Sequence, residues 1–597
     1  MEGFQIRDLT NSPHQPMRKI IFIVILGLIS HPQLKAKPAT GADEGVTVDM
    51  SGTNSVEPET QAAHDARMAW WREAKFGLFI HWGVYAVPAG KYGDVDTYGE
   101  WIMWNTKMSA AEYQGYAKKF NPVKYNPEQW VKIAKDAGMR YMVITSKHHD
   151  GFALFPSQAS KWNVVDASAY GKDLLGPLVN AAHSQDLKIG FYYSHAQDWN
   201  NRGGAIKSFK EGDGWDESQK GSFDSYLEKT ATPQIREILT NYPIDILWWD
   251  TPLHMYKPRA EPIAKMLKQL RPNILTNLRL GGGYGDYATP EQFVPSTGLK
   301  GDWETCMTMN KHWGYNAADQ NWKSSPELIQ KLITICAKGG NFLLNVGPTA
   351  EGEIPAESVK RLNDVGQWLK VNGESIYGTT AGPFPFLTWG AATRKNQIVY
   401  LHVFNWPENG ELRLPLHSKI KSTTLLIDSS KQLETTQNSA GTIIQLPKQA
   451  PDSVATVIKL EVAEEPKVEP IASFNKKLIA SSESPKNRVA AAQDGDAAQY
   501  WEAAADDKNA YLEYDLGKPT LIHALAVDEP DRWPRYKQEL RVEIETDKGW
   551  TPLLSTLTNG HGHQAKFPAI TVQKIRLYIK RELGPPGIAE WQIYSPE

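Results

Sequence analysis

The sequence predicts a multidomain fold: a (β/α)8-like TIM barrel, then an antiparallel β-sandwich, then a third region that is again all-β in pattern. Apolar strand patterns alternate with helical stretches from residue 70 to residue 378, which is typical of a parallel sheet with crossover helices. After residue 378 the pattern changes to short strands separated by turns. The 597 residues also exceed what one hydrophobic core usually fills, so several domains are expected.

The N-terminal segment has the pattern of a secretory signal peptide. A basic dipeptide precedes an apolar run over residues 20–29, and the small residue Ala36 offers a cleavage site. The run is too short to span a bilayer well, although an apolar tail or anchor is the alternative. We therefore predict an N-terminal extension and signal peptide over residues 1–38, with translation starting at Met1 or Met17.

Amino-acid composition indicates the compartment of the protein and excludes some classes of partner. An exported chain with only two cysteines indicates a bacterial periplasm or cell surface rather than an animal extracellular fluid. No membrane span is expected once the signal is removed. A formal net charge of -3 gives no basic surface for nucleic acid, and two cysteines supply neither a disulfide framework nor a zinc set. The sequence does not indicate an oligomeric state.

The barrel is predicted over residues 63–378, after a polar linker at residues 39–62. A closed barrel and an open doubly wound sheet both fit the alternation of strands and helices. Polar residues occur at the ends of many strands rather than at one switch point, which favours the barrel. The strand candidates are residues 76–81, 141–146, 188–194, 245–250, 274–278 and 341–346.

The strand at residues 244–250 is the most informative of these segments, because it ends in Trp248, Trp249 and Asp250. A buried strand has no structural need for a charge at its carboxyl end, since burying an unpaired carboxylate is costly. In a barrel that end carries the chemistry. Asp250 is therefore the first catalytic candidate and the tryptophans are candidate substrate walls, with capping of the next loop as the alternative.

Other strands also end in polar side chains, namely His81, His148, His149, Tyr192 and Arg279. Each would need its own buried partner if it were only structural, so their convergence on one rim favours a functional site. The adjacent histidines suggest a metal, but neighbouring residues of a strand point to opposite faces, and no HxH or HExxH spacing is present. No complete phosphate loop and no GxSxG elbow is present either.

The remaining set of carboxylates, His, Arg, Tyr and Trp is typical of a sugar site. Imidazoles and Arg hydrogen-bond to hydroxyls, indoles pack on the apolar faces of sugars, and two carboxyl groups cleave a glycosidic bond. Asp250 supplies one carboxyl group. Glu291 and Glu304 are the candidates for the second, which must act first as acid and then as base, and the residues alone do not rank them.

Several motifs closely resemble the α-L-fucosidases of glycoside hydrolase family 29. They lie, in order, at residues 76–83, 100–101, 147–152, 190–194, 248–250 and 338–348. The resemblance implies a retaining enzyme with a (β/α)8-like catalytic barrel and a following β-sandwich. It also implies that Asp250 is the nucleophile and that Trp248 is a neighbouring substrate wall. The implied fucose contacts are His81, Glu100, Trp101, His148, His149, Tyr192 and Arg279.

The acid/base of that family is a glutamate that closely follows the substrate arginine where it is best defined. Glu291 lies twelve residues after Arg279 and fits, whereas the runner-up Glu304 lies further on and is interpreted as a supporting or subsite residue. The resemblance thus implies an exo-α-L-fucosidase that acts on terminal α-L-fucosides of oligosaccharides or glycoconjugates, with no cofactor and no active-site metal. Residues 305–316 resemble the branch with broad aglycone tolerance.

Two alternatives stay open, a related barrel glycosidase of other sugar specificity and an inactive glycan-binding protein.

Residues 379–463 are predicted to form the β-sandwich and residues 464–470 a charged linker that contains proline. Residues 471–597 resemble the discoidin, or factor 5/8 C-type, domain, which implies a carbohydrate-binding-like jelly roll whose aromatic residues are mostly core. Asp494 and Glu590 are candidate ligands for a structural Ca²⁺ there, and a spacer domain is the alternative.

Overall fold

The computed structural model describes residues 52–596, apart from residues 58, 205–209, 497–498, 531–537, 559–561 and 582–583. The predicted signal peptide and most of the following linker therefore lie outside the described residues. Within the described part of the chain, no helix is long and apolar enough to cross a membrane.

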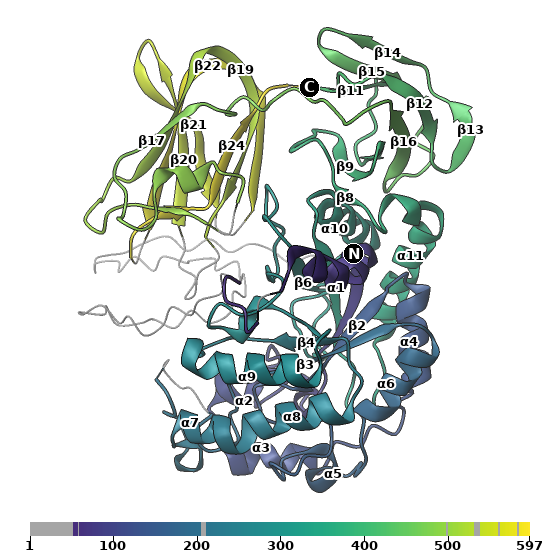
Figure 1. Ribbon diagram of the computed structural model, residues 1–597, viewed down its shortest axis with the longest axis vertical. Helices are drawn as coiled ribbons and strands as arrows, with labels where there is room; N and C mark the ends of the chain where they lie inside the picture. Colours follow the sequence, from purple (N-terminus) through teal and green to yellow (C-terminus); the bar gives the residue numbers. More distant parts are fainter. Residues whose placement is uncertain are drawn as a thin grey trace, which may run out of the picture. The chain divides into compact units, whose positions relative to one another are not determined.

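Seven parallel strands form the first sheet, in the order β5-β4-β3-β2-β1-β7-β6. Strands β2, β3, β4 and β6 of this sheet are labelled in Figure 1. Their bounds are β1 (Phe76–Ile80), β2 (Tyr141–Lys147), β3 (Lys188–Tyr193), β4 (Ile246–Trp249), β5 (Leu275–Thr276), β6 (Glu304–Thr308) and β7 (Asn341–Val346). Residues 287–291 link the two edges through isolated parallel bridges, with Asn277 just beyond β5 and with Trp303 and Cys306 at β6. This segment occupies the place of an eighth strand, and the predicted TIM-like class is confirmed.

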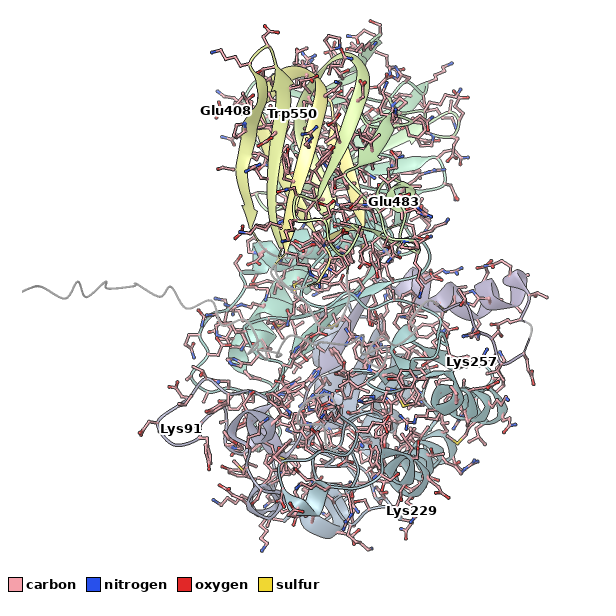
Figure 2. All side chains as sticks on the ribbon, turned by 90° about the vertical axis from the view of Figure 1, so that its left-hand side faces the viewer. Lys91, Lys229, Lys257, Glu408, Glu483 and Trp550 are labelled. Carbon is pink, nitrogen blue, oxygen red and sulfur yellow. The ribbon has the colours of Figure 1, made fainter. Side chains whose placement is uncertain are left out.

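Helices surround this sheet (Figure 1). The longer ones are α1 (Gln61–Ala74), α3 (Ala110–Ala117), α4 (Pro127–Asp136), α6 (Leu175–Ser184), α8 (Thr232–Asn241), α9 (Lys257–Leu270), α10 (Ser325–Ala337) and α11 (Ala356–Asn372). Short helices lie in the connecting loops, namely α2 (Ile102–Thr106), α5 (Val164–Ala167) and α7 (Phe223–Tyr226). In α4 the side chain of Asn126 accepts a hydrogen bond from the Gln129 amide, and the helix buries Trp130 and Ala134. Charged residues such as Lys229 and Lys257 lie on the outer surface (Figure 2).

The barrel interior is filled by large side chains from several strands. Phe79, Tyr141, Tyr192 and Trp248 belong to one buried cluster, which α1 joins through Met68, Trp71 and Ala74. Interior side chains from different strands stack in layers in such a barrel. The apolar interior therefore forms a rigid base beneath the polar residues at the strand ends.

Two antiparallel β regions follow the barrel. The first contains a six-stranded sheet in the order β13-β12-β16-β10-β9-β8 and a three-stranded sheet in the order β11-β15-β14. Their bounds are β8 (Thr380–Ala381), β9 (Gly390–Lys395), β10 (Ile398–Val403), β11 (Glu411–Leu414), β12 (Ile420–Leu425), β13 (Asp428–Gln432), β14 (Thr435–Asn438), β15 (Gly441–Gln445) and β16 (Thr456–Val462). Leu401, Leu412 and Ile458 are among the residues of its core.

The second region forms a larger sheet in the order β17-β19-β22-β20-β21, with β24 beside β19 and a separate β18-β23 pair. The bounds are β17 (Lys477–Ala480), β18 (Trp501–Glu502), β19 (Tyr511–Asp528), β20 (Gln538–Thr546), β21 (Gly549–Thr558), β22 (His563–Arg581), β23 (Gly587–Ile588) and β24 (Glu590–Tyr594). Trp501, Tyr514 and Trp591 are buried in its core, as expected for the aromatic residues of these motifs.

Candidate active site

Asp250 follows β4 directly, and four donor groups surround its carboxyl group. Arg279 Nη1 lies 2.5 Å from Oδ1, and the Thr251 amide donates to the same oxygen at 2.8 Å. The Tyr192 hydroxyl donates to Oδ2 at 2.8 Å, and His149 Nε2 lies 3.4 Å from that oxygen. Burial alone would raise the pKa of Asp250, but the His149 hydrogen bond and the Arg279 charge hold it well below its usual range.

Arg279 bridges two carboxyl groups. It lies in the short turn after β5, and its Nη2 donates to Glu291 Oε2 at 3.0 Å while Nη1 contacts Asp250. The Thr289 hydroxyl and carbonyl accept from the same guanidinium at 2.8 and 3.0 Å. Burial opposes the charge of Arg279, but Glu291 and Asp250 raise its pKa. The sheet therefore brings Asp250, Arg279 and Glu291 into one hydrogen-bonded group.

Both carboxylates are followed by a residue with left-handed backbone. Thr251 has φ 39° and Gln292 has φ 65°, conformations that are uncommon for residues with a side chain. In the first case the turn directs the Thr251 amide back to Asp250. Gln292 directly follows the segment at residues 287–291 that occupies the place of an eighth strand, in which Glu291 pairs with Cys306.

The three histidines are buried beside this group. Asn345 donates through Nδ2 to the Trp313 carbonyl, so its Oδ1 accepts from His81 Nδ1 at 2.7 Å. The other ring nitrogen of His81 is thereby left as an acceptor. His149 Nδ1 lies 2.6 Å from Ser194 Oγ. Burial lowers the pKa of both His81 and His148, which keeps these two imidazoles neutral near pH 7.

Aromatic rings complete the site. His148 stacks on Tyr192 with ring centroids 5.5 Å apart, and Tyr192 stacks on Trp248 at 5.6 Å. Trp101, at the start of α2, lies edge-on to His149 at 5.1 Å. These rings could pack against the apolar face of a sugar.

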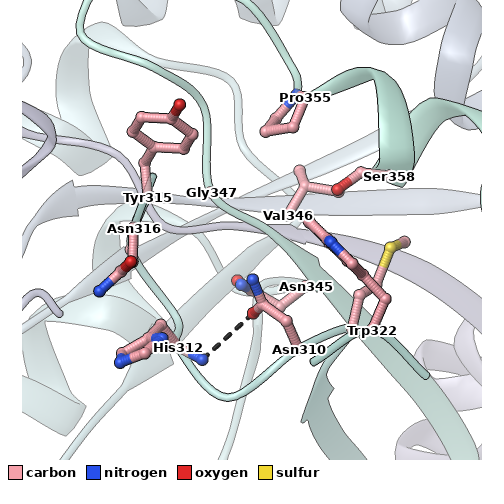
Figure 3. A pocket seen from close by; sticks show the side chains of 12 residues that line it. Asn310, His312, Tyr315, Asn316, Trp322, Asn345, Val346, Gly347, Pro355 and Ser358 are labelled. Carbon is pink, nitrogen blue, oxygen red and sulfur yellow. Dashed lines mark hydrogen bonds between the residues drawn. The ribbon is translucent and has the colours of Figure 1, made fainter. Parts of the chain in front are cut away.

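The loops after β6 and β7 form a small pocket beside the site, which is lined by Asn310, His312, Tyr315, Asn316 and Asn345 among others (Figure 3). The His312 amide donates to Asn310 Oδ1 at 3.1 Å, and Glu100 accepts from the Gly314 amide at 2.9 Å. Glu100 thus fixes the loop that forms this wall. Sequence reasoning missed Asn345 and Ser194, although a polar residue inside the apolar 341–346 segment is a signal that could have identified Asn345.

Glu304 lies apart from the Asp250 group. It is the first residue of β6 and pairs with Asn341, the first residue of β7, whereas Asp250 and Arg279 follow the carboxyl ends of their strands. Its carboxyl group accepts from the Tyr141 hydroxyl at 2.5 Å and from Trp248 Nε1 at 3.0 Å. Burial raises the pKa of Glu304 to about 7.

One cluster of possible metal ligands and one pair of carboxylates bear on metal binding in the described residues. Ligand atoms of His148, His149 and Asp250 lie within 4.8 Å of one another, but both oxygens of Asp250 already accept hydrogen bonds from protein donors. We therefore interpret that cluster as a hydrogen-bonded group rather than as a metal site. In the C-terminal region Glu590 Oε2 accepts a hydrogen bond from the Gly495 amide at 3.1 Å. Gly495 directly follows Asp494 in the sequence. Carboxylate oxygens of this kind suit Ca²⁺.

A parallel barrel with two carboxyl groups held by one arginine beyond the carboxyl ends of its strands is the arrangement expected of a barrel glycoside hydrolase. Comparison with known proteins gives the family. The Alpha-L-fucosidase family model matches residues 47–374, the Alpha-L-fucosidase C-terminal domain matches residues 388–461, and the F5/8 type C domain matches residues 477–592. The chain therefore belongs to the α-L-fucosidase family, whose members are glycoside hydrolases.

Individual relatives belong to the same family. The chain is 30% identical to an α-L-fucosidase of Dictyostelium discoideum over 64% of this chain and 89% of that protein. It is 32% identical to human plasma α-L-fucosidase over 59% of this chain and 79% of that protein. Among solved structures, α-L-fucosidase isoenzyme 1 of Paenibacillus thiaminolyticus has a TM-score of 0.60 at 34% identity, covering 67% of this chain and all of that one.

A Bacteroides thetaiotaomicron α-L-fucosidase was solved as a trapped covalent intermediate with 2-fluoro-fucosyl fluoride. It has a TM-score of 0.61 at 29% identity, covering 70% of this chain and 99% of that one. A covalent intermediate is the mark of a retaining glycosidase, so this likeness supports a retaining mechanism for the family.

Proposed function

We propose that the protein is an exported, retaining exo-α-L-fucosidase with Asp250 as nucleophile and Glu291 as general acid/base. The observation that carries the proposal is the Arg279 bridge between these two carboxyl groups. A nucleophile must be ionised, and the low pKa of Asp250 meets that need. Glu291 sits on the segment that replaces the eighth strand, next to the same arginine.

The reaction then proceeds in two steps. Asp250 attacks the anomeric carbon of an α-L-fucoside while Glu291 donates a proton to the leaving oxygen, and a fucosyl ester of Asp250 forms. Glu291, now a carboxylate, takes a proton from water, which attacks the anomeric carbon and releases fucose with retained configuration. Arg279 and Tyr192 donate hydrogen bonds to Asp250 and hold its carboxyl plane for the attack.

The substrates we propose are terminal α-L-fucosides of oligosaccharides or glycoconjugates. His81, His148, His149, Glu100 and Trp101 are the proposed fucose contacts. The neutral imidazole of His81 has one nitrogen fixed by Asn345, so its other nitrogen is free to accept from a sugar hydroxyl. A bacterial fucosidase that covers 71% of this chain was solved with a dihydroxy-methylpyrrolidine inhibitor.

Release of nitrophenol from 4-nitrophenyl α-L-fucoside tests the function directly. We expect turnover by the wild type and loss of it in Glu291→Ala, with azide restoring activity to that variant, because azide needs no general base. Faster cleavage of a galactoside would favour another sugar specificity. Binding without any turnover would favour a glycan-binding protein. A separation of Asp250 and Glu291 carboxyl oxygens well above the ~5–5.5 Å of retaining enzymes would contradict the assignment.

Export and calcium are further parts of the proposal. Mass spectrometry of the protein secreted by its host should find the N-terminus near residue 38, and retention of the basic dipeptide would contradict cleavage. We propose Asp494 and Glu590 as oxygen ligands for a structural Ca²⁺ in the C-terminal domain, since burial raises the pKa of Glu590 to about 7 and a cation would compensate its charge. Gly495 and Gln592 each donate to one Glu590 oxygen, whereas each Asp250 oxygen has two donors.

A further inference from the structure

We propose that Glu304 is a positioning residue whose buried carboxyl group fixes the Trp248 indole and, through that ring, the two donors that hold Asp250. The inference rests on the proposed role of Asp250. It gives Glu304 a function distinct from acid/base catalysis.

The carboxyl group lies inside the barrel, away from solvent. Glu304 is fully buried, and its two oxygens accept from Tyr141 at 2.5 Å and from Trp248 Nε1 at 3.0 Å. Among the described residues, neither oxygen is hydrogen-bonded to Asp250, Arg279 or Glu291. An apolar side chain of similar size would fill this space without the cost of burying a carboxyl group, so the polar contact itself needs an explanation.

Trp248 connects this carboxyl group to the catalytic end. Its ring stacks on Tyr192 with an interplanar angle of 17°, and Arg279 Cζ lies 5.1 Å from the ring centroid. Tyr192 and Arg279 are the same residues that donate to the two oxygens of Asp250. A tilt of the indole would therefore displace both donors together. Phe79, 5.0 Å from Trp248, packs on the ring but offers it no polar contact.

The indole N–H has one acceptor in the described structure, which is Glu304. Without it the donor would be orphaned in an apolar interior, at a cost of about 1–3 kcal/mol, and the ring would be free to rotate toward another acceptor. The contact survives in both protonation states of Glu304. Oε1 can accept from the indole whether the group is a carboxylate or a carboxylic acid that donates to Tyr141 through Oε2.

The matched substitutions are Glu304→Gln and Glu304→Met. The glutamine keeps an acceptor for Trp248 and offers its amide to the Tyr141 oxygen, while methionine keeps the volume and removes the acceptor. We expect kcat on 4-nitrophenyl α-L-fucoside to fall within about threefold for Glu304→Gln and by about 10- to 100-fold for Glu304→Met, because misplacement of reacting groups by about 1 Å can cost 100-fold. Thermal unfolding checks that each variant is folded.

A double-mutant cycle separates positioning from general damage to the core. Trp248→Phe removes the indole N–H, so in that background Glu304→Met should cost little further kcat. Equal loss in both backgrounds would overturn the relay. Tyr287→Phe is the control for packing, because it removes a buried hydroxyl of the same interior cluster that has no hydrogen-bond partner in the described structure. It should leave kcat within about twofold.

The outcomes distinguish this inference from the proposed function. Wild-type kcat in Glu304→Met, with Glu291→Ala still inactive, would overturn the positioning role alone. A loss above about a thousandfold in Glu304→Gln, restored by azide, would identify Glu304 as the acid/base and overturn both the inference and the Glu291 assignment.

Discussion

Replacing Glu304 by glutamine should make the protein more stable than the wild type at alkaline pH. Burial holds the pKa of Glu304 at about 7 in the folded protein, against 4.5 for an ordinary glutamate. The unfolded chain therefore loses its proton at a lower pH than the folded chain. The folded state is at its full relative stability below the unfolded pKa, and that stability is lost as pH rises to the folded pKa.

The magnitude follows from the difference between the two pKa values. Between pH 5 and pH 8 the wild type should lose about 2.5 kcal/mol of unfolding free energy through this group, at 1.36 kcal/mol per pKa unit. Solvent screening does not reduce this effect of the pKa shift on stability, because Glu304 is fully buried. Glu304→Gln does not titrate and escapes this loss. The difference in Tm between variant and wild type should thus rise by several degrees from pH 5 to pH 8.

The assay is thermal unfolding of both proteins at pH 5, 6, 7 and 8. Asp150 and Glu590 also have pKa values raised to about 7 by burial, but they are present in both proteins and their effects cancel in the difference. A Tm difference that stays constant across this range would mean that Glu304 titrates alike in the folded and unfolded chain, which contradicts a raised pKa in the folded protein.

Three other predictions follow from the site. Asp250→Ala should lower kcat on 4-nitrophenyl α-L-fucoside at least about a thousandfold, and activity within tenfold of the wild type would remove Asp250 as nucleophile. Asn345→Ala should raise KM about tenfold with a smaller effect on kcat, because His81 loses the acceptor that sets its tautomer, and an unchanged KM would contradict that role. EDTA should leave kcat unchanged, because Asp250 is satisfied by protein donors, while lowering Tm if Ca²⁺ binds at Asp494 and Glu590. A loss of kcat that Zn²⁺ restores would instead make the His148–His149–Asp250 cluster a metal site.

Much of the fold could be predicted because the buried parallel strands are short apolar runs. The exceptions are instructive. Strand β6 (Glu304–Thr308) escaped prediction because it begins with a carboxylate and carries two threonines, so its burial depends on partners from Tyr141 and Trp248 rather than on its own hydrophobicity. Likewise, residues 287–291 form only isolated bridges, and no periodic pattern marks them as part of the barrel.

The site was predictable to the extent that strand ends converge in space. His81, His149 and Asp250 could be grouped on that basis, since each ends or follows an apolar run. The hydrogen bonds that orient them could not, because Asn345 and Ser194 are separated from their histidine partners by 264 and 45 residues. The resemblance to α-L-fucosidases favoured Glu291 over Glu304. In the structure Arg279 donates to both Asp250 and Glu291, whereas the Glu304 oxygens accept from Tyr141 and Trp248.

Asp250 and Glu304 are both largely buried, but the protein solvates their carboxyl groups differently. Asp250 receives a cation, a phenol, an imidazole and an amide, and these donors outweigh the cost of burial and keep it ionised. Glu304 receives no cation among the described residues. Its donors are neutral groups such as the Tyr141 phenol and the Trp248 indole, and they do not outweigh burial, so its pKa rises to about 7. The same tryptophan that binds Glu304 packs against the phenol and the cation of Asp250. Asp250 is thereby kept charged, as the proposed nucleophile must be, while Glu304 can remain neutral in the core and still orient the ring between them.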